Sequence, residues 1–295
     1  MTASNQFERK LQFSPCLNTN PKKLKLKQIQ DFNNYGFIFP VEVFSGEEIN
    51  YHQKSFEELL IKARKKGFDS YSLAGWEEYV PYLYDICLNP AILDYVEDLI
   101  GPNILCWVTH YFAKQPGEDV QVSWHQDASY WPLSPSLTVT GWLALDEVDE
   151  GNGPMQFIPR SHLHGHIEFE DSTAEENNVL VQKVVAPDQY GDCPVSVIMN
   201  AGQMSLHSDL LLHGSSPNRS DRRRCALTFR FTPPEVTPLS ADKKEAILCR
   251  GENISTGWIN RKRPLKENIP DYYRQEWRGD KKENFNQFGK HKRAL

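Results

Sequence analysis

The spacing of hydrophobic and polar positions changes near residue 101 and divides the chain into a helical part and a strand-rich part. Before that point, apolar residues recur at helical spacing. Ser45 precedes one such run as a helix N-cap, and Gly67 stands where that helix would end. Asn89 and Pro90 start a further helix, which Gly101 ends. The pattern therefore predicts mainly helical structure before the strands begin.

After Gly101 the chain consists of short runs of β-branched and aromatic residues, separated by Gly, Pro, Asn and Asp. These runs cover residues 104–112, 120–125, 139–145, 155–158, 195–199, 204–213 and 224–231. A helix over residues 28–35 and a short buried strand over 37–39 precede them. Several short strands divided by turn residues are typical of an all-β sandwich or barrel. We therefore expect a mainly β fold with flanking helices.

Composition divides the chain into three segments. Residues 1–23 are polar and without periodicity, which predicts a flexible arm. Residues 24–235 are expected to form a single domain with a helical N-terminal part, and their polar insertion over 160–194 is typical of a lid. Residues 236–295 are charged and irregular, and we expect a C-terminal extension that packs on the barrel through its aromatic residues. Those residues are Trp258, Tyr272, Tyr273 and Trp277.

Charge and hydropathy exclude several classes of partner. The chain has 33 basic and 39 acidic residues and a net charge of -6, which gives no electrostatic footprint for nucleic acid. No apolar run reaches about 18 residues, so we expect no membrane-spanning helix. Six scattered cysteines without a CxxC pair, and no secretory pattern at the start, favour reduced thiols and a cytoplasmic location. The sequence does not indicate the oligomeric state.

Three residues have the types and spacing of a metal site. His125 and Asp127 lie two residues apart in one strand-like run, and His213 lies in a later run. On an extended chain, residues i and i+2 point to the same side. Two histidines and one carboxylate form the ligand set that binds non-haem Fe(II) and leaves coordination positions open. We therefore predict that these three bind a metal; the alternative is a hydrogen-bonded pair on a barrel wall.

A second histidine–aspartate pair competes for the same assignment. His207 and Asp209 lie shortly before His213. Three ligands on one straight strand would spread over on the order of 20 Å, whereas metal–ligand bonds are about 2 Å long. A second strand must therefore contribute, so the site is either His125 and Asp127 with His213, or His207 and Asp209 with His125. We favour the first, which makes His207 a structural residue of the interior.

An arginine-rich stretch follows the last proposed ligand. Arg224 lies eleven residues after His213, across a turn that would join two antiparallel strands. A guanidinium binds a carboxylate through two hydrogen bonds, as anchoring the distal carboxylate of 2-oxoglutarate requires. We expect Arg224 inside and its neighbours at the surface; Arg230, with the same strand parity, is the alternative anchor. The neighbours are Arg219, Arg222 and Arg223.

Over residues 28–235 the chain resembles the phytanoyl-CoA dioxygenase family, whose members are Fe(II)- and 2-oxoglutarate-dependent oxygenases. The motifs that carry the resemblance are Lys114-Gln115-Pro116-Gly117, Trp124-His125-Gln126-Asp127, Tyr130-Trp131, Gly153-Pro154-Met155, Pro159-Arg160-Ser161-His162, and His213-Gly214-Ser215 followed by Arg224. The resemblance implies a double-stranded β-helix of the jelly-roll or cupin-like kind. One departure is Arg160, where glycine is usual in the family; it would contact an anionic substrate or face solvent.

The same resemblance implies roles for particular residues. His125, Asp127 and His213 would be the iron ligands. Arg224 and Ser215 would bind the distal carboxylate of 2-oxoglutarate. Trp131 and Thr109 would line the cosubstrate and the iron. Related halogenases replace the carboxylate ligand with Gly or Ala, so the presence of Asp127 argues for hydroxylation rather than chlorination.

The implied reaction is hydroxylation of an unactivated C–H bond of a small molecule, with Fe(II), 2-oxoglutarate and O₂, releasing succinate and CO₂. The substrate class that we expect is a secondary metabolite, such as an alkaloid-like toxin. Alternatives are desaturation, cyclisation or epimerisation at the same iron, or a non-catalytic jelly roll that only binds metal. Four acidic loop residues have two interpretations: they would bind a guanidinium-bearing substrate, or they are ordinary solvated loop residues. They are Asp149, Glu150, Glu168 and Glu170.

Overall fold

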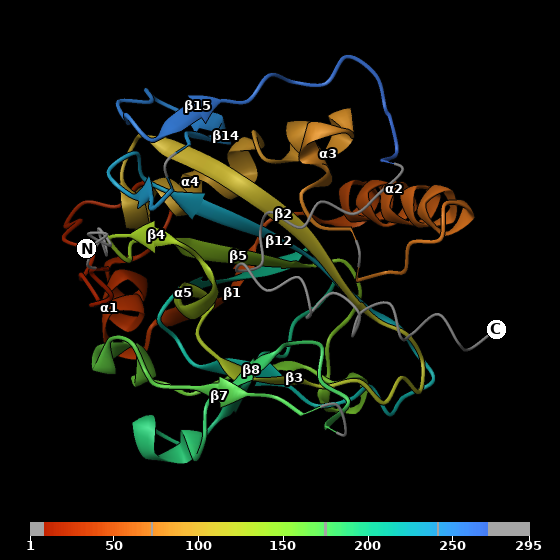
Figure 1. Cartoon of the computed structure of the whole chain (residues 1–295), viewed down its shortest axis with the longest axis horizontal. Coiled ribbons are helices and arrows are strands. Elements are labelled where there is room, and N and C mark those ends of the chain that lie inside the picture. The colour runs from red at the N-terminus through yellow and green to blue at the C-terminus, as the bar shows by residue number, and fades with distance from the viewer. Residues whose placement is uncertain (1–8, 72, 174–175, 241, 271–295) are drawn as a thin grey trace, which may run out of the picture.

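The computed structural model describes residues 9–71, 73–173, 176–240 and 242–270. Two β-sheets face each other, and helices cover the outer face of the larger one (Figure 1). The helices are α1 (Leu26–Tyr35), α2 (Gly46–Lys65), α3 (Pro81–Ile86), α4 (Pro90–Ile100) and the single turn α5 (Asp127–Tyr130). The predicted mainly β fold with flanking helices is confirmed, with the jelly-roll arrangement that the family resemblance implied.

The larger sheet has seven strands in the order β1-β10-β5-β12-β2-β14-β15. Its neighbouring strands are antiparallel, except that β14 and β15 run parallel. The strands are β1 (Phe37–Glu42), β2 (Ile104–Lys114), β5 (Val139–Ala144), β10 (Gln203–Ser208), β12 (Arg224–Thr232), β14 (Lys244–Arg250) and β15 (Trp258–Asn260).

The smaller sheet has four strands in the order β3-β11-β6-β9, and two short ribbons accompany it. The four strands are β3 (Val122–His125), β6 (Met155–Phe157), β9 (Val195–Ser196) and β11 (His213–Ser215). The ribbons pair β4 (Leu133–Ser134) with β13 (Thr237–Pro238), and β7 (Glu170–Asp171) with β8 (Gln182–Lys183). The run predicted over 204–213 is thus not one strand, because the chain leaves the larger sheet after Ser208 and enters the smaller sheet at His213.

Alternation along β12 separates the two faces of the larger sheet. Leu227, Phe229 and Phe231 are fully buried in the cluster that the helices share. Ala226 faces the opposite way, into the cluster between the two sheets. Strand side chains alternate between faces, so the even-numbered residues Arg224 to Arg230 point between the sheets, where the predicted site lies.

Local sequence signals set the helix ends. Ser45 and Glu48 form a capping box at the start of α2, as its N-cap position predicts. Asn89 caps α4 by accepting a hydrogen bond from the Ala91 N–H, and Pro90 occupies the first helical position. Gly36 ends α1 with a φ of 89°, a conformation that glycine adopts without strain. None of the helices in the described ranges is long and apolar enough to cross a membrane.

The N-terminal segment differs from the flexible arm predicted over 1–23. Residues 9–23 make specific contacts, while 1–8 lie outside the described residues. The Asp98 carboxylate accepts hydrogen bonds from the backbone N–H groups of Lys22, Lys23 and Leu24. Arg9 donates to the backbone carbonyls of Ala128 and Trp131. Polar anchoring of this kind leaves no hydrophobic periodicity in the sequence, which is why the composition suggested a loose arm.

The C-terminal extension, residues 236–295, contributes strands to the fold as far as it is described. β14 pairs with β2, and β15 continues the larger sheet. Trp258 is buried in a cluster with Trp107 and Trp131, and its indole N–H donates to the carbonyl of Val236. The other three aromatic residues named above, Tyr272, Tyr273 and Trp277, lie outside the described residues.

Candidate active site

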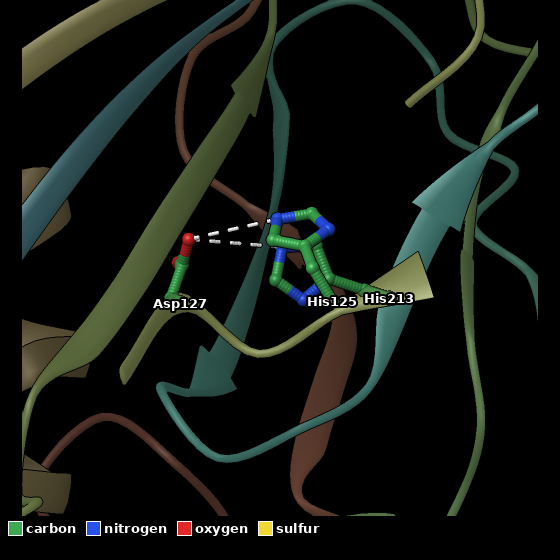
Figure 2. Close-up of side chains that lie close together, drawn as sticks. All are labelled: His125, Asp127 and His213. Atoms are coloured by element: carbon green, nitrogen blue, oxygen red, sulfur yellow. Dashed lines mark ion pairs between the residues drawn. The ribbon is translucent and has the colours of Figure 1, made fainter. Parts of the chain in front are cut away.

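His125, Asp127 and His213 converge between the two sheets. The Nε2 atoms of His125 and His213 lie 3.8 Å and 3.9 Å from Oδ1 of Asp127. Figure 2 shows the two imidazoles and the carboxylate pointing toward one another. One atom of each residue falls within 4.8 Å of the others, a spread that a metal with bonds of about 2 Å can bridge after small adjustments.

The local backbone explains how the three meet. His125 ends β3 and pairs with His213 on β11, so the two rings are cross-strand neighbours. The sequence suggested that Asp127 lies on the same strand as His125. In the structure, Asp127 is instead the first residue of α5. Gln126 between them is extended, with a φ of -107° and a ψ of 131°, so Asp127 still faces the side that His125 faces.

Both histidines present a lone pair toward the carboxylate. The carbonyl oxygens of Ser123 and Leu211 lie 2.8 Å and 2.9 Å from Nδ1 of His125 and His213, respectively. A carbonyl only accepts, so each Nδ1 carries the proton and each Nε2 is free to bind a metal. Burial, and then the neighbouring His213, lower the pKa of His125 to about 3, and burial also lowers the pKa of His213. Both rings are therefore neutral near pH 7, as metal ligands must be.

Asp127 is ionised and oriented. Burial alone would raise its pKa, but the Arg230 guanidinium and then His213 outweigh it and lower the pKa to about 2. The Thr140 hydroxyl donates to Oδ2 at 2.9 Å, on the side away from the two Nε2 atoms. Two neutral nitrogens and one carboxylate are the donor set that suits Fe(II) and leaves positions open.

The competing pair, His207 and Asp209, does not form the site. Asp209 accepts a hydrogen bond from Ser136, and burial raises its pKa to about 7. His207 lies inside the barrel, with Nε2 3.9 Å from Oδ2 of Asp127. Among the described residues, neither of its ring nitrogens has a hydrogen-bond partner. His207 therefore lies beside the proposed metal ligands, and Asp209 stabilises the turn that follows β10.

Arg224 lies six residues before Arg230 on β12, whereas Arg230 pairs with Thr140 beside the metal ligands. Its guanidinium carbon is 5.5 Å from the centre of the Trp142 ring, and its Nη atoms donate to the carbonyls of Phe112 and Gly153. Trp142 is two residues along β5 from Thr140, or about 7 Å. Arg224 therefore lies on the face of the larger sheet that carries the metal ligands, and its binding of the distal carboxylate of 2-oxoglutarate stays a prediction.

Lys114 is a second basic side chain at this end, and it was not identified as a site residue from the sequence. Its Nζ donates to Oγ of Ser215 at 2.7 Å and to the Ser216 carbonyl, and Lys114 pairs with Arg224 across the strands. Because Lys114 donates to Oγ, the Ser215 hydroxyl hydrogen is free to point elsewhere, for example toward a bound carboxylate. A signal was available in the Lys-Gln-Pro-Gly motif, but a lysine at the end of a strand is usually exposed.

Trp131 and Thr109 were both predicted to line the cosubstrate and the iron, but only Trp131 lies on the side of the site. Trp131 is buried next to the site, with its ring 5.6 Å from the guanidinium carbon of Arg230. Thr109 lies on the opposite face of β2, where its hydroxyl donates to Glu77 at 2.7 Å. Its register partner Phe229 belongs to the helix-side cluster. We therefore leave Thr109 out of the proposed site.

The arginines next to Arg224 lie at the surface. Arg222 pairs with Glu147 and Asp149, and Arg223 with Asp146 and Glu57. Arg160 also faces solvent, where it pairs with Asp192 at 3.2 Å. Its φ of 71° is a conformation that favours glycine, which explains why glycine is usual at this position in the family.

The insertion over 160–194 borders β3 and therefore lies close to the metal ligands. The Val184 N–H donates to the Trp124 carbonyl at 2.8 Å, and Gln182 forms hydrogen bonds with Tyr130. Figure 1 shows β7 and β8 of this insertion beside β3. Gln126, between two ligands, binds the backbone of Gly165. The insertion therefore borders the metal ligands, and its role as a lid stays a prediction.

Comparison with known proteins agrees with the family resemblance seen in the sequence. Residues 32–226 match the family model described as phytanoyl-CoA dioxygenase (PhyH). A peroxisomal phytanoyl-CoA dioxygenase of Rattus norvegicus is 28% identical over 243 residues, covering 75% of this chain and 71% of the relative. The L-proline trans-4-hydroxylase of Streptomyces griseoviridis is 27% identical over 178 residues, covering 55% and 66%. The solved structure of ThoJ, a non-haem monooxygenase, superposes with a TM-score of 0.71 at 27% identity, covering 81% and 88%.

Proposed function

Because the chain belongs to the phytanoyl-CoA dioxygenase family and is therefore a 2-oxoglutarate-dependent non-haem iron dioxygenase, we propose that it hydroxylates an unactivated C–H bond of a small molecule. The reaction would consume O₂ and release succinate and CO₂. The observation that carries this proposal is a ligand set of two neutral histidines and one carboxylate, with the buried Arg224 farther along the same face of the larger sheet. A chelating keto acid would span these two ends.

The residues of this chain have distinct tasks in that reaction. When bound, Fe(II) with 2-oxoglutarate supplies the oxidising chemistry. His125, Asp127 and His213 would hold the metal and leave coordination positions open. Arg224 and Ser215 would orient the distal carboxylate of the cosubstrate. Trp131 would lie beside the bound molecules, and the insertion next to β3 would exclude water during the reaction.

Asp127 favours hydroxylation over chlorination. Its carboxylate occupies the ligand position that the related halogenases leave open for chloride. Desaturation, cyclisation and epimerisation use the same ligands and remain alternatives within the proposal. Product mass distinguishes them, because hydroxylation adds one oxygen, desaturation removes two hydrogens and epimerisation leaves the mass unchanged.

We also propose that the protein acts in the cytoplasm and that its substrate is a small molecule of secondary metabolism. The relative named L-proline trans-4-hydroxylase supports a small-molecule substrate. The loop acids give no support for a guanidinium-bearing, alkaloid-like one. Asp149 pairs with Arg222, and Glu170 pairs with Lys183 at 3.3 Å. Glu150 accepts a hydrogen bond from Ser196, and Glu168 is exposed.

The test is an anaerobic titration with Fe(II) and 2-oxoglutarate, followed through the weak visible charge-transfer band of the chelate. The wild type and His164→Ala should form the band, because the His164 side chain is exposed and its ring lies against Tyr190. His125→Ala should lose it. A wild-type protein that binds iron but forms no band would refute the cosubstrate assignment and favour a metal-binding jelly roll without catalysis.

A second measurement tests catalysis itself. The wild type under O₂ should slowly convert 2-oxoglutarate into succinate even without substrate, and His125→Ala should not. Metal binding without succinate formation, in the presence of candidate substrates, would be the behaviour of a non-catalytic module. Mass spectrometry of the product then decides between hydroxylation and its alternatives.

A further inference from the structure

Arg230 is a second buried arginine that the cosubstrate anchor does not use. It lies on β12 opposite Thr140, the residue that donates to Asp127, so it is level with the metal ligands. Its guanidinium carbon lies 5.6 Å from the Trp131 ring and 5.7 Å from the Phe112 ring. The residue is only 7% exposed. It thus presents a positive charge, flanked by two aromatic rings, beside the metal site.

The surroundings of Arg230 contain no dedicated counter-charge. Among the described residues, no carboxylate oxygen lies within 4.0 Å of its guanidinium, and one Nη donates to the Thr228 hydroxyl. Its Nε has no hydrogen-bond partner within the same described part of the chain. Asp127 is the nearest strong electrostatic influence, but its oxygens face the histidines and Thr140. A buried charge left unpaired in this way is costly.

The charges of the loaded site leave Arg230 uncompensated. The two positive charges of Fe(II) are balanced by Asp127 and by the chelating carboxylate of 2-oxoglutarate, because the histidines are neutral. The distal carboxylate balances Arg224. The positive charge of Arg230 then remains beside the metal ligands, whereas Lys114 contacts Ser215 at the Arg224 end. An anionic group of the substrate would compensate Arg230.

We propose that Arg230 binds a carboxylate group of the substrate, so that the substrate is a small carboxylic acid. A guanidinium fork recognises a carboxylate through paired hydrogen bonds, and the unpartnered Nε is one of the required donors. The Trp131 and Phe112 rings would contact the apolar part of the acid. This assignment rests on the proposed function, because it uses the charges of the iron and the cosubstrate.

The first experiment separates Arg230 from the cosubstrate anchor. The variants are Arg230→Met, which removes the charge, Arg230→Lys, which keeps it, and Arg224→Met. The 2-oxoglutarate concentration that gives half of the maximal chelate band should stay within about twofold of wild type in both Arg230 variants. In Arg224→Met it should rise about tenfold or more. An equal rise in Arg230→Met would make Arg230 a cosubstrate contact and overturn the proposal.

The second experiment measures ligand binding rather than activity. Thermal unfolding is followed with Mn(II) and saturating 2-oxoglutarate, in the presence of 3-phenylpropionate, cyclohexanecarboxylate or octanoate, and of the matching neutral amides. In the wild type and Arg230→Lys, at least one acid should raise the unfolding temperature more than its amide does. The apparent affinity for that acid should fall about tenfold or more in Arg230→Met.

The outcomes distinguish this inference from the proposed function. If no acid exceeds its amide at millimolar concentration, or if Arg230→Met keeps the difference, the carboxylate assignment is wrong. If the wild type forms no chelate band, the proposed function fails, whatever the acids do. If Arg230→Met does not fold, the comparison of Arg230→Gln with Arg230→Lys, both polar and of similar length, gives the same decision.

Discussion

The Thr140 hydroxyl donates a hydrogen bond of 2.9 Å to Oδ2 of Asp127, the carboxylate oxygen directed away from the Nε2 atoms of the two histidines. The other oxygen, Oδ1, lies 3.8 Å and 3.9 Å from those nitrogens. The two oxygens of one carboxylate therefore have separate roles, one oriented by β5 and the other directed at the metal position. A ligand fixed in this way needs little reorganisation when the metal binds.

Replacing Thr140 by valine should weaken metal binding while preserving the fold. Valine has nearly the same shape but cannot donate to Asp127, and loss of such a supporting hydrogen bond typically costs about 10- to 100-fold in metal affinity. An anaerobic Co(II) titration measures the change. The matched control is Thr138→Val on the same side of the strand, whose hydroxyl contacts Thr232 at 3.4 Å. Equal Co(II) affinity in the two variants would show that the Thr140 contact does not orient the ligand.

Gln126 should be the main link between the metal ligands and the insertion. It is fully buried, and its side chain donates to the carbonyls of Gly165 and Leu210 and accepts from the Ile167 N–H. Gln126→Leu would leave three backbone groups unsatisfied, at a cost of about 3 kcal/mol in the free energy of unfolding. Urea denaturation measures this, and Gln156→Leu, half-buried on β6, is the control. A change below about 0.5 kcal/mol would contradict the expected role.

The ligand triad could be predicted from the sequence because two of its three residues are near neighbours along the chain. His125 and Asp127 are separated by one extended residue. Reach required a further ligand from another strand, and the family resemblance favoured His213. Burial, by contrast, depends on the whole fold. Lys114 is 1% exposed only because β11 and the loop after it cover the end of β2. Nothing in the neighbouring sequence requires that.

The sequence also did not predict which face of β2 carries Thr109, or that β14 pairs with β2. Thr109 is one residue away from the side of β2 that faces the site, and a single step changes the face of a strand. β14 carries charged residues at both ends, and its strand conformation depends on pairing with β2, more than a hundred residues earlier in the chain. β propensity reflects such packing partners more than intrinsic backbone preference.

Arg224→Met should weaken 2-oxoglutarate binding much more than it weakens metal binding. The guanidinium is 3% exposed and would lose a charge-assisted pair with the distal carboxylate, a change of about tenfold or more in affinity. Arg222→Met is the control, because that arginine pairs with Glu147 and Asp149 at the surface. Titration of the chelate band with 2-oxoglutarate at fixed Fe(II) gives the cosubstrate affinity, and an anaerobic Co(II) titration gives the metal affinity. If Arg222→Met weakened the cosubstrate equally, the anchor assignment would be wrong.

Arg261 should stabilise the fold through a buried ion pair with Glu77. Glu77 is fully buried, and burial raises its pKa while Arg261 opposes that rise. Arg261→Met would leave a buried carboxylate without its cation, at a cost of about 3–5 kcal/mol. Arg263→Met breaks only an exposed pair with Asp85 and should cost below about 1 kcal/mol. Guanidinium denaturation of both variants measures the difference, and similar losses would show that burial of the pair is unimportant.

The affinity for 2-oxoglutarate should fall as pH rises above about 6, because of Lys114. Burial, and then the Arg224 cation, lower the pKa of Lys114 to about 6, against an opposing effect of Glu118. The empty site therefore holds mostly neutral amine at pH 8, and a carboxylate bound beside it would raise that pKa, so binding takes up a proton. Affinity should fall by up to about tenfold per pH unit above this pKa and be flat below it.

Band titrations at pH 5.5, 6.5, 7.5 and 8.5 would test this, with Lys114→Met as the comparison. The variant cannot take up the proton, so its dissociation constant should change little across the range and should exceed that of wild type most strongly at low pH. Protonation of other groups affects both proteins equally and cancels in the ratio. A ratio that does not change with pH would mean that Lys114 keeps one protonation state throughout. It would then act on the cosubstrate only through its hydrogen bond to Ser215.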